Sequence, residues 1–314
     1  MADDLPGSGE DSELSLVLSR LRGSPPTISP RYFYDAAGSR LFDAITRTAE
    51  YYPTRTELSI LRERGAGLGA RVPAGAALIE LGSGSGDKIL ALLEHLDRPC
   101  LYRPIDISRA ALDATCAALH SARPDLSLSP FLGDFTDERA YRELPSGAPR
   151  LVYYSGSTIG NFEPAEAVAF LTSLRARLSP GDALLLAADL VKDPAILHAA
   201  YNDAAGVTAA FNRNLLAHLN HRFGGTFDPA DFEHRAFYEP RRRRIEMHLV
   251  PLRSHAVSLG GERLELDPSR PIHTENSYKF TIDDLDGLAR RAGFVVDHVE
   301  TDPQAWFALA LFRA

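Results

Sequence analysis

The sequence predicts an α/β protein built on a doubly wound, mostly parallel sheet, with a second, α+β domain beside it. Three observations support this fold class. Short apolar runs alternate with helical stretches between residues 76 and 190, a glycine-rich turn follows the first run, and a helix and two apolar strands return at 282–313. Strands and helices that alternate with short connections form a parallel sheet covered by helices on both faces.

The alternating part begins with an apolar run at 76–81, which predicts a strand, and an amphipathic stretch at 87–96, which predicts a helix. The later elements follow the same pattern. In chain order they are a strand at 101–106, a helix at 108–121, strands at 127–133 and 150–155, a helix at 163–178, a strand at 182–190, a helix at 282–292 that Gly293 ends, and strands at 294–300 and 305–313. We assign them to a nucleotide-binding domain at 61–192 and 281–314.

The remaining segments lack this alternation. They predict helices at 14–22, 38–49 and 54–66, one long helix at 193–218, and hairpin-like strands at 243–252 and 256–266 with Gly260-Gly261 as a tight turn. We assign residues 14–60 and 193–280 to a substrate-binding domain, with a cleft between the two domains. Residues 1–13 are acidic and lack the basic and apolar regions of a signal peptide, so we expect a disordered tail there.

Composition narrows the range of functions. The formal net charge of −8 provides no overall positive field for nucleic acid, and we interpret the basic run Arg241–Arg244 as a solvated strand edge. Cys100 and Cys116 cannot form a disulfide framework, and the ten histidines lack metal-binding spacings. No apolar run is long enough to span a membrane. The sequence therefore predicts a cytoplasmic protein without a metal, and we expect a monomer.

The glycine-rich turn at 82–86 (GSGSG) follows a predicted strand and precedes a helix. Glycines allow such a turn to bend tightly and to approach a ligand closely. The dinucleotide fingerprint GxGxxG would need a third glycine at position 87, where the chain has Asp87. The GxGxG form after an acid instead resembles motif I of class I S-adenosylmethionine (SAM)-dependent methyltransferases. The resemblance makes Gly82, Gly84 and Gly86 cofactor-binding residues.

Two carboxylates follow the next predicted strands. Asp106 ends the strand at 101–106, where an acid can accept hydrogen bonds from both ribose hydroxyls. Asp134, which Phe135 follows, ends the strand at 127–133, where the resembled family pairs an acid with the adenine amino group. Either aspartate alone could be a turn or capping residue. Open α/β sheets bind ligands at their carboxyl edge, so three such features at successive strand ends favour SAM as the cofactor.

Five longer runs are distributed from residue 32 to residue 280. They are 32–42 (YFYDAAGSRLF), 50–57 (EYYPTRTE), 155–162 (SGSTIGNF), 192–214 (KDPAILHAAYNDAAGVTAAFNRN) and 273–280 (HTENSYKF). These runs resemble the histidine-specific Nα-methyltransferases of ergothioneine biosynthesis, which use SAM to trimethylate L-histidine to hercynine. The resemblance covers nearly the whole chain.

The resemblance implies roles for residues in these runs. Tyr34 and Asn161 would act at the amino group that is methylated, with Tyr51 and Gly156 beside them at the substrate. Asn161 and Tyr201 would hold the substrate carboxylate. Neutral hydroxyl and amide groups suit this chemistry, because the amine must lose its proton before it can accept a methyl group, and carboxylates would stabilise the ammonium form. Without the resemblance, the tyrosines could be core aromatics and Asn161 a helix cap.

The run at 273–280 contains the residues expected to recognise the side chain of the substrate. Glu275 and Ser277 point to the same face of a strand, and the resemblance assigns both to the imidazole, with Met247 packed beside it. A buried carboxylate without a ring N–H opposite it would be costly, so Glu275 should reject substrates that lack such a donor. The resemblance also places Lys88 at the cofactor carboxylate. Without the resemblance, Glu275 and Lys88 could be surface residues and Met247 a core residue.

Rival functions remain open from the sequence. A paralogue of the same fold could methylate another amino acid or an aromatic amine. An NAD-dependent oxidoreductase is disfavoured by Asp87, and a binding module without catalysis is the third alternative.

Overall fold

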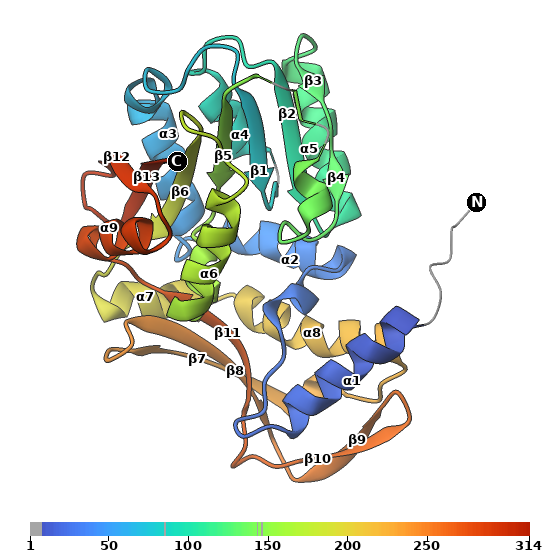
Figure 1. Cartoon of the computed structure of the whole chain (residues 1–314). Coiled ribbons are helices and arrows are strands. Elements are labelled where there is room, and N and C mark those ends of the chain that lie inside the picture. The colour runs from blue at the N-terminus through green and yellow to red at the C-terminus, as the bar shows by residue number, and fades with distance from the viewer. Residues whose placement is uncertain (1–7, 85, 143, 146) are drawn as a thin grey trace.

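The computed structural model describes residues 8–84, 86–142, 144–145 and 147–314. An eight-stranded sheet with helices against it forms one part of the molecule, and a three-stranded antiparallel sheet with further helices forms the other (Figure 1). None of the helices within these ranges is long and apolar enough to cross a membrane.

The large sheet has four parallel central strands that the apolar runs predict. These are β1 (Ala77–Leu81), β2 (Leu101–Asp106), β5 (Arg150–Tyr154) and β6 (Ala183–Asp189). The strand order is β12-β13-β6-β5-β1-β2-β3, with β4 also paired to β2. Strand β13 (Phe307–Arg313) runs antiparallel to both β6 and β12 (Val295–Thr301). This Rossmann-like order with one reversed strand near the edge confirms the predicted class I methyltransferase sheet.

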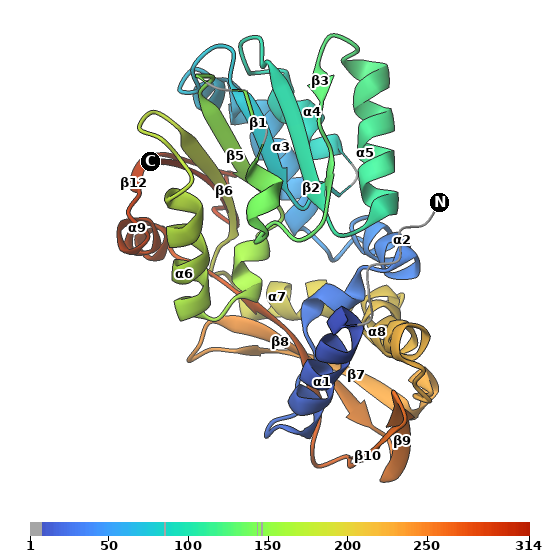
Figure 2. The ribbon, with the colours of Figure 1, turned by 45° about the vertical axis from the view of Figure 1, so that its right-hand side comes forward.

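Helices cover the large sheet on both faces, as Figures 1 and 2 show. Alternate residues of one strand face opposite cores: Leu78 packs with α3 (Pro53–Gly69) and α4 (Asp87–Leu93), and Ile79 packs with α6 (Pro164–Arg175) and α9 (Ile282–Arg291). Helix α5 (Arg109–Ala122) follows β2. Because both faces are buried, the central strands are mostly apolar and do not alternate regularly in polarity, with Glu80 of β1 and Arg103 of β2 as buried exceptions.

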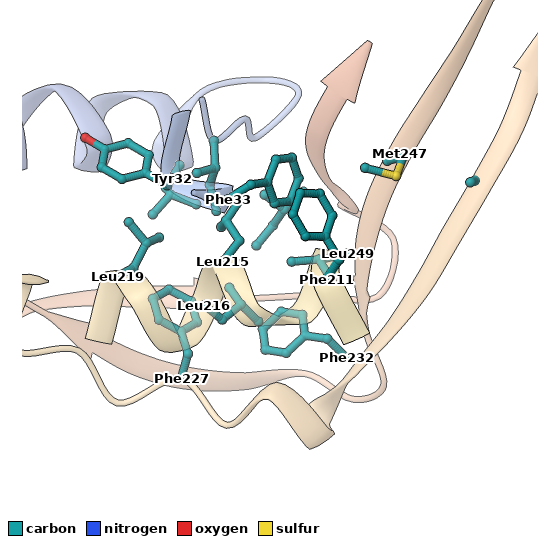
Figure 3. Close-up of a cluster of buried hydrophobic side chains, with 14 of the residues drawn as sticks. Tyr32, Phe33, Phe211, Leu215, Leu216, Leu219, Phe227, Phe232, Met247 and Leu249 are labelled. Atoms are coloured by element: carbon teal, nitrogen blue, oxygen red, sulfur yellow. The ribbon is translucent and has the colours of Figure 1, made fainter. Parts of the chain in front are cut away.

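The smaller sheet has the order β11-β8-β7, with β7 (Phe232–Glu239), β8 (Arg244–Pro251) and β11 (Ile272–Tyr278). Helices α1 (Ser8–Arg22), α2 (Ala36–Ile45), α7 (Pro194–Tyr201) and α8 (Val207–Phe223) pack around it. Figure 3 shows the core between them, where Phe33 stacks on Phe211 with ring centroids 4.6 Å apart. This core holds the segments 8–60 and 193–280 together, although about 130 residues separate them in the sequence.

Several predicted elements differ from the structure. The single helix predicted at 193–218 is two helices, because Asp203 accepts hydrogen bonds from the N–H groups of Val207 and Thr208 and so starts a new helix. The strand predicted at 127–133 is two short strands, β3 (Ser127–Leu128) and β4 (Phe131–Leu132). The Gly260-Gly261 turn lies between β9 (His255–Leu259) and β10 (Glu262–Leu266), and β8 pairs with β7 and β11 instead.

Two predictions about charged segments are wrong in part. Residues 8–13 of the predicted tail are helical, because Glu13 accepts hydrogen bonds from Tyr32 and Arg222 and ties α1 to the core. Residues 1–7 lie outside the described residues. In the basic run, Arg244 is buried and forms ion pairs with Glu163 and Glu246, so only the first three arginines lie in the exposed turn between β7 and β8.

Candidate active site

The glycine turn lies at the carboxyl end of β1. Gly82, Gly84 and Gly86 all have positive φ, at 76°, 56° and 82°, which other residues rarely adopt. Apart from its chain neighbours, a Cβ atom at Gly82 or Gly84 would meet no atom of the described residues within 4 Å. The turn therefore presents bare backbone to open space, as close approach of a ligand requires. Position 85 lies outside the described residues.

The predicted cofactor carboxylates lie at neighbouring strand ends. Asp106 ends β2, and the N–H of Gly133, next to Asp134, donates to the Asp106 carbonyl at 2.9 Å. Oδ1 of Asp106 accepts from the N–H of Ser108 at 2.8 Å, and burial raises the pKa of this carboxyl. Phe135 packs its ring against two aromatic neighbours, Tyr154 at 5.4 Å and Phe170 at 5.3 Å. The structure thus gathers Asp106, Asp134 and Phe135 at the edge of the sheet where the glycine turn also lies.

Beneath the turn lies a buried carboxylate, Glu57 of α3, which sequence reasoning left without a role. It accepts from Lys88 Nζ at 2.9 Å and from the Tyr153 hydroxyl at 2.6 Å, and the N–H of Gly156 approaches both of its oxygens at 3.1–3.2 Å. Lys88 and Gly156 are thus placed side by side by one acid. The signal was present in the sequence, because Glu57 ends the quoted run at 50–57.

A second buried acid, Glu80 of β1, accepts from the Tyr102 hydroxyl at 2.5 Å through Oε2. Its Oε1 is buried without a hydrogen-bond partner among the described residues, and burial raises the pKa of Glu80 to about 8. An unpaired buried acceptor and the open space beside Gly82 and Gly84 fit a ligand that brings hydrogen-bond donors close to the backbone, as the amino-acid end of SAM would.

A small aromatic cavity lies in the part of the molecule that contains the three-stranded sheet. Five residues predicted at the amino group or the substrate line it together: Tyr34, Tyr51, Tyr201, Met247 and Glu275. They come from distant segments, and the pairing of β8 with β11 places Met247 directly beside Glu275. Burial raises the pKa of each of the three tyrosines, so their hydroxyls stay neutral at physiological pH.

Two of these tyrosines also interact electrostatically with acids that do not line the cavity. After burial, interactions with Glu275, Tyr51 and Asp106 raise the pKa of Tyr34 further. Burial likewise raises the pKa of Tyr51, and interactions with Tyr201, Glu275, Asp189 and Glu57 raise it further. Tyr34 and Tyr51 therefore lie within electrostatic reach of both the cavity acid and the cofactor-side acids.

Asn161 meets the same acid. With its amide nitrogen turned toward β11, it donates to the Asn276 carbonyl at 3.0 Å and to Glu275 Oε1 at 3.2 Å. Burial raises the pKa of Glu275 to about 7, although the nearby Lys279 ammonium lowers it. Gly156, predicted at the substrate, instead contacts Glu57 and lies beside Lys88.

Behind the cavity lies a buried ionic cluster that the sequence did not predict. The Asp189 carboxylate, 1% exposed, accepts from Lys192 at 2.5 Å, Lys279 at 2.8 Å and the Tyr52 hydroxyl at 2.7 Å. Burial alone would raise the pKa of Asp189, but the two ammonium groups lower it. Lys279 also donates to Ser277 Oγ at 2.7 Å, and the Tyr201 hydroxyl donates to the same oxygen at 2.7 Å. The cluster thus supports two of the predicted substrate residues from behind.

One group of possible metal ligands occurs in the described ranges. Oxygen and nitrogen atoms of Glu246, His248 and His273 lie within 4.8 Å of one another. Arg244 already donates to Glu246 at 2.5 Å, and its positive charge opposes a cation there. We therefore assign no metal to this group.

Comparison with known proteins decides the family. The family model described as histidine-specific, SAM-dependent methyltransferase matches residues 12–314. The chain belongs to this family. It is 42% identical over 300 residues to the histidine N-alpha-methyltransferase of Mycolicibacterium smegmatis, covering 94% of this chain and 92% of that protein. The protein of the same description from Mycobacterium tuberculosis is 40% identical, with 96% of each chain covered. Ergothioneine biosynthesis protein 1 of Neurospora crassa is 31% identical over 277 residues, which cover 82% of this chain and 31% of that protein.

These matches confirm the family resemblance and the SAM dependence predicted from the sequence, and they exclude the oxidoreductase alternative. The methyltransferase site described above is therefore the natural location for SAM and an acceptor. The roles of individual residues in it, the division into two domains and the monomeric state stay predictions.

Proposed function

We propose that this methyltransferase transfers methyl groups from SAM to the α-amino group of L-histidine, and that it continues to the trimethylated product hercynine as a step of ergothioneine biosynthesis. The observation that carries the proposal is the aromatic cavity, which Tyr34, Tyr51 and Glu275 line together. The names of the relatives at 40–42% identity support the same substrate.

The cavity favours imidazole over an apolar ring. Glu275 is a carboxylate among aromatic and aliphatic side chains, so its charge needs a donor opposite it. The Asn161 amide donates to Glu275 Oε1, and a ring N–H of histidine supplies a further donor that a phenyl ring lacks. Met247, 1% exposed, closes the wall beside Glu275 and limits the size of the ring.

The amino group needs surroundings of a different kind. Bound SAM supplies an electrophilic methyl group, and the amine that receives it must be deprotonated and aligned with it. Tyr34, Tyr51 and Asn161 offer neutral polar groups, which orient an amine without stabilising its ammonium form as a carboxylate would. After methylation the nitrogen carries a fixed positive charge, which the faces of the tyrosine rings and of Phe42 stabilise. In this scheme Asn161 binds the substrate carboxylate, with Lys88 and the glycine turn on the cofactor side.

Calorimetry on Glu275→Ala tests the assignment of the ring. We expect histidine affinity to fall at least about tenfold, since a hydrogen bond to a charged group is lost, while affinity for S-adenosylhomocysteine (SAH) changes less than about twofold. Glu246→Ala is the matched control: it lies on the neighbouring strand, is in the same way partly buried, and is not among the cavity-lining residues, so neither affinity should change. Equal loss of both affinities in Glu275→Ala would show that this residue acts through folding.

An amino-acid panel tests the substrate itself. The enzyme is incubated with labelled SAM and each of the twenty amino acids, and methyl incorporation is compared at equal concentrations. We expect histidine to be preferred, and a preference for tryptophan or tyrosine would support the paralogue alternative instead.

A further inference from the structure

The Lys279 side chain is completely buried and follows the predicted substrate residues on β11. Its ammonium group has three polar neighbours: Asp189 Oδ2 at 2.8 Å, Ser277 Oγ at 2.7 Å and the Tyr201 hydroxyl at 3.3 Å. An ammonium group has three hydrogens to donate and no lone pair. All three partners of Lys279 therefore act as acceptors toward it.

This arrangement determines what Ser277 can still do. A serine hydroxyl has two acceptor lone pairs and one hydrogen. The Ser277 oxygen accepts from Lys279 and from the Tyr201 hydroxyl, each at 2.7 Å, so both lone pairs are used. Only the hydroxyl hydrogen remains for another hydrogen bond, so Ser277 can bind a ligand only as a donor.

We propose that Lys279 is a specificity-determining positioning residue that fixes Ser277 as a hydrogen-bond donor, so that the cavity selects a ring with an unprotonated nitrogen at that position. The inference rests on the proposed function, because it concerns the ring of the same substrate. Glu275, two residues earlier on the same face of β11, accepts the ring N–H, and Ser277 donates to the other nitrogen. One acceptor and one donor together match a neutral imidazole, which carries one N–H and one bare nitrogen.

The chain contains a matched control for Lys279. Lys192 binds the other oxygen of the same carboxylate at 2.5 Å and is also buried, but its hydrogen bonds go to Asp189, Tyr52 and the Leu190 carbonyl. Loss of either lysine removes one positive charge from Asp189. Only the loss of Lys279 frees a lone pair of Ser277, which lets the hydroxyl turn and donate to Tyr201.

The test compares histidine with β-(pyrrol-2-yl)alanine and β-(pyrrol-3-yl)alanine, which keep one ring N–H but replace the other nitrogen by C–H. For each enzyme, kcat/KM is measured for histidine and for the better pyrrole isomer. The wild type should prefer histidine by about tenfold or more, because the pyrrole leaves the buried Ser277 donor unpaired. In Lys279→Met the preference should fall to within about threefold, and in Lys192→Met it should remain as in the wild type.

Other outcomes are equally informative. An unchanged preference in Lys279→Met, or an equal loss in Lys192→Met, would overturn the inference, since the lysine would then act only through the charge of the cluster. If Lys279→Met does not fold, Ser277→Ala takes its place, because it removes the same donor and should show the same loss of preference. Histidinol, which lacks the carboxylate, is measured in the same way. If Lys279→Met lowers the preference for histidine over histidinol but not the preference for histidine over the pyrroles, Lys279 acts on carboxylate binding. That result would also overturn the inference. Failure of the wild type to methylate histidine would refute the proposed function instead.

Discussion

Replacing Glu275 with glutamine should stabilise the fold at neutral pH while it weakens histidine binding. Burial raises the pKa of Glu275 from its ordinary value of 4.5 to about 7, so the folded protein opposes ionisation of this carboxyl. The difference corresponds to about 3 kcal/mol of unfolding free energy as an upper limit. Because the carboxyl is partly open to the cavity and therefore to water, we expect a gain of about 1–2 kcal/mol in the variant.

The sign of this effect depends on pH. Below about pH 4.5 the carboxyl is protonated in both the folded and the unfolded chain, so it costs no stability. As the pH rises through about 7, the Glu275 carboxyl ionises freely in the unfolded chain but only at a cost in free energy in the folded chain. Above that pH the loss of unfolding free energy is complete. Glutamine removes that penalty, so the gain should be absent near pH 4.5 and largest at pH 8.

The assay is urea unfolding of wild type and Glu275→Gln at pH 5 and pH 8, together with histidine titration at pH 8. Glu246→Gln is the control of opposite sign: burial alone would raise the pKa of Glu246, but Arg244 and His248 lower it, so this variant should lose stability at pH 8. A Glu275→Gln variant that is destabilised equally at both pH values would refute the reasoning. It would show that Glu275 is structural and not held ready for a ligand.

Three further outcomes are expected. Glu57→Gln removes the charge that holds Lys88, so SAH affinity should fall about tenfold by calorimetry; an undiminished affinity would exclude a positioning role for Glu57. Gly82→Ala places a side chain at φ 76° in open space. The variant should lose about 1 kcal/mol of stability in urea unfolding and should also bind SAH more weakly. Unaltered SAH binding would show that the ligand does not approach Gly82. Burial alone would raise the pKa of Glu13, but Arg222 and Tyr32 help to lower it to about 2, so Glu13→Gln should lower the Tm at pH 7 and less so near pH 3; a pH-independent loss would contradict this ion pairing.

Local patterns were sufficient to predict the large sheet. Apolar runs that end in glycine or aspartate mark parallel strands buried on both faces, and the carboxyl ends of such strands lie at one edge whatever the loops between them do. The glycine turn, Asp106 and Asp134 therefore lie where the sequence predicted. The break at Asp203 was missed because helical periodicity continues on both sides of it, and only the cap geometry distinguishes two helices from one.

The network behind the site could not be predicted in this way. Lys192 lies three residues after Asp189, but Lys279 is far away in the sequence. Its contact with Asp189 depends on the bridge between Leu190 and Phe280, which follow β6 and β11. A lysine at the end of a strand is most often a surface residue, so Lys279 carried no signal of its own. Glu57 was hidden for the same reason, since a single glutamate on a helix looks solvated until its three donors are seen around it.

Mass spectrometry of the products formed from L-histidine and SAM determines which atom is methylated and how many methyl groups are added. We expect one substrate molecule to gain three methyl groups on the α-nitrogen, with the imidazole unmodified in the fragment spectrum. We expect Glu275→Ala to form much less product at the same histidine concentration. Methylation of a ring nitrogen, or no methylated histidine while another amino acid is methylated, would show that the enzyme is not a histidine Nα-methyltransferase.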